Sequence, residues 1–197
     1  AEARGTATVK PIYTSIDGGL HWSASDVESG AWTSLAMSAD GGRLFAADGV
    51  TGAIYLSTNA GAHWSPINNP STATYGKVIT FACSEDGTRL ILGTTTTVLT
   101  SVDSGANWTE RRIAVADKNW FVASSATGKE LTATEASDSF VSTDAGVTWV
   151  AQSFNINPDR VDISSDGRRL AAGFTGTLPS NVYQVPGKGF GNGLLLS

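Results

Sequence analysis

Short apolar runs recur along the 197-residue chain, and clusters of Gly, Asp, Ser and Thr separate them. Runs of this length are too short for amphipathic helices and have the length of β-strands. They are rich in Val, Ile, Thr and Phe, which fit a pleated sheet. The pattern predicts strands at Pro11–Thr14, Thr33–Met37, Leu44–Ala47, Ile54–Leu56, Ile79–Cys83, Leu90–Gly93, Val98–Thr100, Trp120–Ser124, Leu131–Thr134, Phe140–Val141, Val161–Ile163 and Leu170–Phe174.

One phrase, S-x-[DN]-x-G-x-x-W, occurs four times, at 15–22, 57–64, 101–108 and 142–149. Its third position is 42, 44 and 41 residues apart in successive copies, which indicates a repeat architecture. Each copy follows a predicted strand, so we interpret it as a turn whose Asp or Asn side chain accepts hydrogen bonds from its own backbone. The tryptophan that ends each copy is expected to pack between repeats. These structural residues are Asp17, Trp22, Asn59, Trp64, Asp103, Trp108, Asp144 and Trp149.

A second type of turn alternates with the first. Its copies are centred on Asp40-Gly41, Asp86-Gly87, Thr127-Gly128 and Asp166-Gly167, and each lies between two apolar runs. An Asp-Gly pair in that position predicts a tight hairpin. Each repeat then contains strand A, the Gly turn, strand B, a loop, strand C, the Trp-ending turn and strand D. Four antiparallel strands in such a period are typical of one β-propeller blade.

The four Trp-ending turns resemble Asp boxes, the BNR repeats of β-propellers such as sialidases, xyloglucanases, sortilin-type receptors and photosystem II assembly factors. The resemblance covers roughly residues 9–174. It implies an all-β propeller with the boxes at the C–D turns, away from the functional face. It does not define a function, because the family includes hydrolases, receptors and scaffolds.

The order of the turns predicts how the propeller closes. The chain starts with strands C and D and ends with strands A and B, so the two ends are expected to pair and complete a shared blade. We therefore expect one domain over 1–185, with four blades favoured and five possible, and a Gly-rich tail over 186–197. Asn181–Val185 reads as an extra strand that could begin a fifth blade.

Composition and charge limit the classes of function that the chain can have. The formal net charge is −5, which argues against a nucleic-acid partner, because such sites need a basic stripe. No apolar window is long enough to span a membrane. Charged residues make up only 16% of the chain and there is a single cysteine. This composition favours a secreted protein.

No catalytic residue, metal site or cofactor is predicted. Phosphate-loop, zinc-protease and nucleophile-elbow motifs do not occur, and the two histidines, His21 and His63, occupy the same slot of their boxes. The resemblance implies that a sialidase would need an arginine cluster and an early Arg-Ile-Pro, but Arg4 precedes Gly and the next arginine is Arg43. A carboxylate pair of another glycosidase type stays open, because its separation is invisible in sequence.

Ligand binding is expected on the face that carries the D–A and B–C loops, where residues are not dictated by the repeat. An aromatic ring there could stack on a sugar or anchor a peptide, or it could fill the central channel. The candidates are Trp32, Tyr75, Arg111, Lys118, Trp120, Asp159 and Arg160.

The sequence therefore predicts a secreted, non-enzymatic binding propeller with a glycan or protein ligand. The alternatives are a propeller-type glycoside hydrolase or lyase, and a structural module of an oligomeric assembly; the oligomeric state stays open. Asn107-Trp108-Thr109 is a glycosylation sequon inside the third box, so we expect Asn107 to face solvent.

Overall fold

The computed structural model describes residues 11–27, 30–68, 70, 72–111, 113, 119–135, 138–153, 158–174 and 193–196. Three four-stranded antiparallel sheets form its centre, each built from four consecutive strands. The first sheet contains β3 (Trp32–Met37), β4 (Leu44–Asp48), β5 (Ile54–Ser57) and β6 (Ser65–Pro66). The second contains β7 (Val78–Cys83), β8 (Leu90–Thr94), β9 (Val98–Ser101) and β10 (Thr109–Arg111), and the third β11 (Phe121–Ser124), β12 (Leu131–Glu135), β13 (Asp138–Ser142) and β14 (Val150–Ser153).

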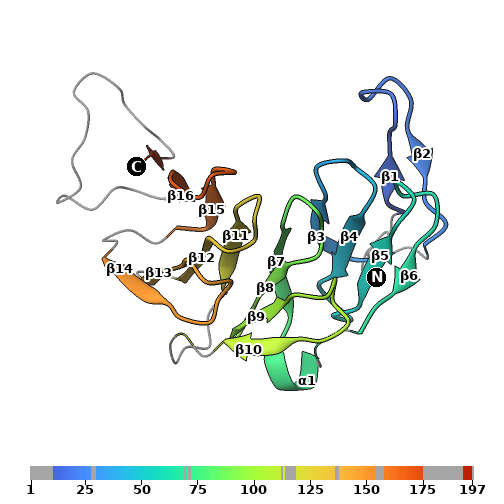
Figure 1. The fold of residues 1–197 in the computed structure, drawn as a ribbon. Coiled ribbons are helices and arrows are strands. Elements are labelled where there is room, and N and C mark those ends of the chain that lie inside the picture. Colours follow the sequence, from blue (N-terminus) through green and yellow to red (C-terminus); the bar gives the residue numbers. More distant parts are fainter. Residues whose placement is uncertain are drawn as a thin grey trace, which may run out of the picture.

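These strands occupy the A, B, C and D positions that the repeat predicts. Neighbouring sheets stand side by side in chain order, with the A–B turns along the upper edge of Figure 1. A four-residue helix, α1 (Thr72–Tyr75), lies at the opposite edge, in the D–A loop before β7. The described chain is otherwise β-structure, as expected.

The expected pairing of the two chain ends is not found among the described residues. β1 (Tyr13–Thr14) pairs with β2 (Ser23–Ala24) in a separate hairpin, and this hairpin lies at one end of the row of sheets. β15 (Arg160–Ile163) and β16 (Leu170–Phe174) lie at the other end. The edge of β16 that was expected to bind β1 pairs instead with β17 (Gly193–Leu196), so the described sheets form an open arc.

β17 falls within 186–197, which the sequence assigns to a Gly-rich tail. It takes the strand C position, because Gly173 of β16 faces Leu194 while the equivalent Ala47 of β4 faces Ile54. Asn181–Val185, the expected extra strand, lies outside the described residues. The same is true of Lys118.

Each A–B turn is stabilised by one serine. In the first turn, Ser38 Oγ donates to Asp40 Oδ1 at 2.6 Å and accepts from the Arg43 N–H at 2.9 Å. The turn glycines, Gly41 among them, have φ values of 66–74°, a region that side chains with Cβ disfavour. The third turn has Thr127 in the Asp position, and there the Glu130 carboxylate accepts from Ser125 at 2.7 Å instead.

Apolar side chains fill the boundaries between sheets. Phe45 of the first sheet meets Phe81 of the second with ring centroids 5.5 Å apart. Ile91 of the second sheet joins Trp120 and Val122 of the third in another buried cluster. The core is therefore a series of layers between sheets, as in a propeller, because a lone four-stranded sheet leaves both of its faces uncovered.

A line of backbone hydrogen bonds also crosses these boundaries at the A–B turns. The Ala39 N–H donates to the Glu85 carbonyl at 2.8 Å, the Glu85 N–H to the Ala126 carbonyl at 2.8 Å, and the Ala126 N–H to the Ser165 carbonyl at 3.0 Å. We call this series the turn belt. It fixes the stagger of each sheet against the next.

Candidate functional site

The Trp-ending turns form nearly identical hydrogen-bond networks. In the third copy, Ser101 Oγ donates to Asp103 Oδ1 at 2.8 Å and accepts from the Gly105 N–H at 2.9 Å. Asp103 Oδ1 also accepts the Asn107 N–H at 2.9 Å. The residue between Asp and Gly is left-handed, and at Ala60, Ser104 and Ala145 it is not a glycine. The Asp or Asn side chain is therefore committed to hydrogen bonds within its own turn.

These turns hold their carboxylates in the charged state. Hydrogen bonds from the backbone and side chain of His21 lower the pKa of Asp17 to about 2. Hydrogen bonds from the side chain and backbone of Thr148 lower the pKa of Asp144 to about 2. The Asn107 side chain lowers the pKa of Asp103 in the same way. A carboxylate with a lowered pKa is a poor general acid near neutral pH.

The box tryptophans pack toward the preceding sheet. Trp64 is 5% exposed and contacts the N-terminal hairpin, and Trp108 Nε1 donates to the Asn68 carbonyl at 2.7 Å. Trp149 packs against the cluster between the second and third sheets. Trp22 departs from the expectation that it packs between repeats: it is 62% exposed, because no described sheet precedes its hairpin.

Among the aromatic loop-face candidates, the two tryptophans contribute to the core. Trp120 is 1% exposed and lies 6.0 Å from Phe140, centroid to centroid. Trp32 is partly buried, with its ring edge-on to Tyr55 at 5.6 Å. Tyr75 is half-buried in α1, and its carbonyl accepts the Thr96 hydroxyl at 2.6 Å. Both tryptophans therefore belong to the apolar layers beside their sheets.

The charged candidates do not converge on one point. Arg111 donates from Nε to Thr100 Oγ1 at 2.8 Å, on the outer part of the second sheet. Arg160 is exposed and lies over the Phe121 ring, 5.9 Å from its centroid. Asp159 is adjacent to it, and its N–H donates to the Gly173 carbonyl at 2.9 Å. Asp159 and Arg160 are thus together at the start of β15, whereas Arg111 is elsewhere.

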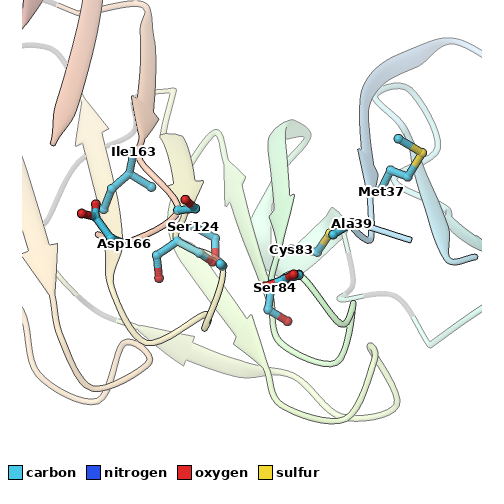
Figure 2. A pocket seen from close by; sticks show the side chains of 11 residues that line it. Met37, Ala39, Cys83, Ser84, Ser124, Ile163 and Asp166 are labelled. Atoms are coloured by element: carbon cyan, nitrogen blue, oxygen red, sulfur yellow. The ribbon is translucent and has the colours of Figure 1, made fainter. Parts of the chain in front are cut away.

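A groove on the opposite edge, at the A–B turns, was not predicted from the sequence. It has a volume of about 610 Å³ and runs across the ends of all four A strands (Figure 2). We call it the A–B groove. Met37, Cys83, Ser124 and Ile163 line it from the strand ends, and the turns add Ala39, Ser84, Glu85, Ser125, Ala126, Ser165 and Asp166. These positions recur in the repeats, so the sequence pattern indicated a structural role for them. The signal that could have identified the groove is that the four A strands end at equivalent positions.

The chemistry of the A–B groove is that of a binding surface. Among the described residues, its charged side chains are the carboxylates of Glu85 and Asp166, and no basic residue lines it. Burial, and then the charge of Asp86, raises the pKa of the Cys83 thiol to about 11, which keeps the thiol protonated and weakly nucleophilic. Hydrogen bonds from Ser164 and the Arg168 backbone lower the pKa of Asp166.

Within the described ranges, no three His, Cys, Asp or Glu side chains gather closely enough to hold a metal ion. No helix in the same residues combines the length and apolar character of a membrane span.

No protein-family model and no curated protein matches the sequence. Solved structures do match in three dimensions. The GH74 xyloglucanase from Xanthomonas campestris aligns with a TM-score of 0.63 at 21% identity, over 84% of this chain and 31% of that one. YCF48 from Cyanidioschyzon merolae aligns with a TM-score of 0.60 at 12% identity, over 84% of this chain and 57% of that one. The WD40 repeats of RRP9 align with a TM-score of 0.59 at 17% identity, over 73% of this chain and 44% of that one.

The chain thus spans less than two thirds of each of these solved proteins. Identities this low establish architecture and leave activity open. Taken with the repeated four-stranded sheets and the layered core, they show that the chain has a β-propeller fold.

Proposed function

We propose that this chain is a non-enzymatic binding propeller whose A–B groove takes an extended polypeptide segment. The observation that carries the proposal is the lining of that groove. The apolar side chains of Met37 and Ile163 line its two ends, and serine hydroxyls and the Glu85 and Asp166 carboxylates complete the lining. Such a surface suits a neutral or basic segment with one apolar side chain and disfavours an acidic one.

A structural neighbour supports a peptide ligand. YCF48 bound to D1 peptide aligns with a TM-score of 0.56 at 19% identity, over 81% of this chain and 52% of that one. We extend peptide binding to this chain because it shares the fold of that neighbour and has a groove of its own. A secreted location, inferred from the low charge and single cysteine, is a further part of the proposal.

Carbohydrate binding or hydrolysis is the second candidate, because a GH74 xyloglucanase is among the neighbours. A glycosidase needs a carboxyl group that stays protonated near neutral pH. Where the pKa of a described carboxyl group clearly departs from its usual value, as at Asp17, Asp86 and Asp144, it is lowered by hydrogen bonds. These three groups are therefore poor candidates for that acid.

The test is an array of neutral, basic and acidic peptides, run beside a glycan array and a glycosidase screen. Glu85→Lys reverses an exposed charge in the A–B groove, and Asp138→Lys makes the same change at the opposite end of the third sheet. We expect the wild-type chain to retain neutral or basic peptides. Glu85→Lys should weaken this binding about tenfold, and Asp138→Lys should leave it intact. Retention lost only in Asp138→Lys would move the site to the D–A and B–C loops, and glycan turnover would replace the proposal with the hydrolase.

A further inference from the structure

One end of the row of sheets exposes large apolar side chains. Leu35 on β3 is 58% exposed, and Trp22 of the N-terminal hairpin is 62% exposed. A hollow of about 660 Å³ separates the hairpin from the turn that follows β3. We call this surface the N-terminal face; its large apolar residues are Tyr13, Ile16, Leu20, Trp22, Leu35 and Met37. Exposed apolar clusters of this kind mark interaction sites.

The same positions are buried wherever a sheet precedes them. Leu35 has Phe81 and Val122 as its equivalents in the second and third sheets, and both are 6% exposed. Trp22 has Trp64 as its equivalent in the first sheet, which is 5% exposed. The N-terminal face is therefore the next member of a series of inter-sheet surfaces. An A–B half sheet would cover Leu35, and the sheet before it would cover Trp22.

The contacts in this series have a direction. The residue after each A–B turn packs over the turn glycine of the following sheet. A Cβ on Gly87 would lie 3.0 Å from Arg43, one on Gly128 2.7 Å from Arg89, and one on Gly167 2.5 Å from Glu130. On Gly41 the nearest atom is Sδ of Met37, 3.9 Å away in the same sheet. The turn belt likewise begins at Ala39 and ends at Ser165.

The other end of the chain carries the half sheet that would continue this series. β15 and β16 are A and B strands joined by the same serine-based turn, in which Ser164 Oγ donates to Asp166 at 2.6 Å. Ala171 on β16 is the equivalent of Phe45, the residue that meets Phe81 across the first boundary. A following sheet would therefore place a Leu35-type position against Ala171, and its Ala39-type carbonyl near the Ser165 N–H.

We propose that two copies of this chain join head to tail, with β15–β16 of one copy covering the N-terminal face of the other. Within one chain these two ends are separated by three complete sheets and lie at opposite ends of the arc (Figure 1). A second copy offers each end a complementary half sheet. Two such junctions close a ring of eight four-stranded sheets, within the range of about four to eight blades that propellers adopt.

The junction includes an exchange of strands. β17 occupies the strand C edge of β16, with Leu195 opposite Ala172. In the pair, β1 of the second copy takes that edge and β17 leaves it, so that one antiparallel pairing replaces another. The N-terminal hairpin and β15–β16 then form a four-stranded sheet like the three inside each chain.

Light scattering after size-exclusion chromatography of the full chain tests the proposal. We expect a mass about twice the monomer's 20.4 kDa. Leu35→Asp charges the N-terminal face and should shift the peak to the monomer mass. Val102→Asp is the matched control, because Val102 is 59% exposed on an internal box turn and the variant should stay paired. A monomeric wild-type chain, whether open or closed on itself, or a dimer that Leu35→Asp leaves intact, overturns the proposal.

Two variants at the other end separate this junction from any other dimer. Ala171→Asp should also give monomers, yet an equimolar mixture with Leu35→Asp should form a heterodimer, because one junction then joins two unaltered surfaces. Leu195→Pro removes an N–H from β17, so it should strengthen the association of the wild-type surfaces. Failure of the mixture to associate, or weaker association of Leu195→Pro, contradicts the head-to-tail arrangement; circular dichroism confirms that each variant is folded.

Discussion

Trp64 Nε1 donates to the carbonyl oxygen of Gly61 at 3.1 Å, and this bond holds the indole inside the boundary between the N-terminal hairpin and the first sheet. Trp22 makes the same bond to Gly19 at 3.0 Å while remaining largely exposed. The turn thus sets the orientation of the ring, and the neighbouring element decides whether it is buried.

Trp64→Ala should lower the free energy of unfolding by about 3–5 kcal/mol, because it leaves a cavity among Ile12, Val27 and Ala46. Trp64→Phe keeps a ring and loses the bond to Gly61, so it should cost about 1–2 kcal/mol. Urea denaturation followed by circular dichroism measures both. Equal losses for the two variants would show that the hydrogen bond, rather than packing, stabilises this boundary.

Acid should destabilise the fold through the box carboxylates. The pKa of Asp17 and of Asp144 is lowered from 3.8 to about 2, so their stabilising contribution is complete above the unfolded-state value of 3.8 and is lost as the pH falls through about 2. Asp144→Asn should reduce the fall in melting temperature over that window, because an amide oxygen still accepts from Ser142 and Thr148. Asn59 already serves in that way, accepting from Ser57 at 2.9 Å.

The control for the acid experiment is Asp138→Asn, which removes an exposed carboxylate outside the box turns. It should leave the fall in melting temperature as in the wild type. If Asp138→Asn and Asp144→Asn have equal effects, overall charge rather than turn geometry governs the acid response.

The glycosylation sequon should be usable. Asn107 is exposed, and its Nδ2 donates to Asp103 at 2.7 Å. Expression in a eukaryotic secretory host should add one glycan, visible by mass spectrometry before and after enzymatic removal. Asn107→Thr removes the sequon and should keep the turn, because Thr148 in the same slot donates its hydroxyl to Asp144 at 2.6 Å. A lower melting temperature for the unglycosylated Asn107→Thr chain would contradict the equivalence of the two slots.

The periodic features of the sequence predicted the strands and turns, because these elements depend on local bonding. Ser101, Asp103 and Gly105 lie within one turn, so their network forms wherever the phrase occurs. The partner of a strand edge is a different matter: the repeat pattern assigned the edge of β16 to β1, whereas β17 occupies it. The open arc and the strand C role of Gly193–Leu196 were therefore outside what the repeat could specify.

The repeat pattern was also a poor guide to the candidate binding residues. Trp32 and Trp120 stood out because they break the repeat, but they are accommodated by neighbours such as Tyr55 and Phe140. The A–B groove is lined by residues that obey the repeat, so nothing in the pattern marked them. Glu85 becomes part of the A–B groove only because the fold brings the ends of four strands side by side.

Two glycines in the same slot of strand B should respond differently to substitution. A Cβ on Gly93 would lie 2.2 Å from the backbone oxygen of Trp120, which belongs to the next sheet and cannot move alone. A Cβ on Gly173 would meet nothing nearer than the Cβ of Arg160, at 3.6 Å, an ordinary contact. Gly93→Ala should therefore lower the free energy of unfolding by about 1–3 kcal/mol, as expected for overpacking, while Gly173→Ala should leave it nearly unchanged. Urea denaturation of both variants measures the difference, and equal effects would mean that the second and third sheets are not as closely packed as the Gly93–Trp120 approach requires.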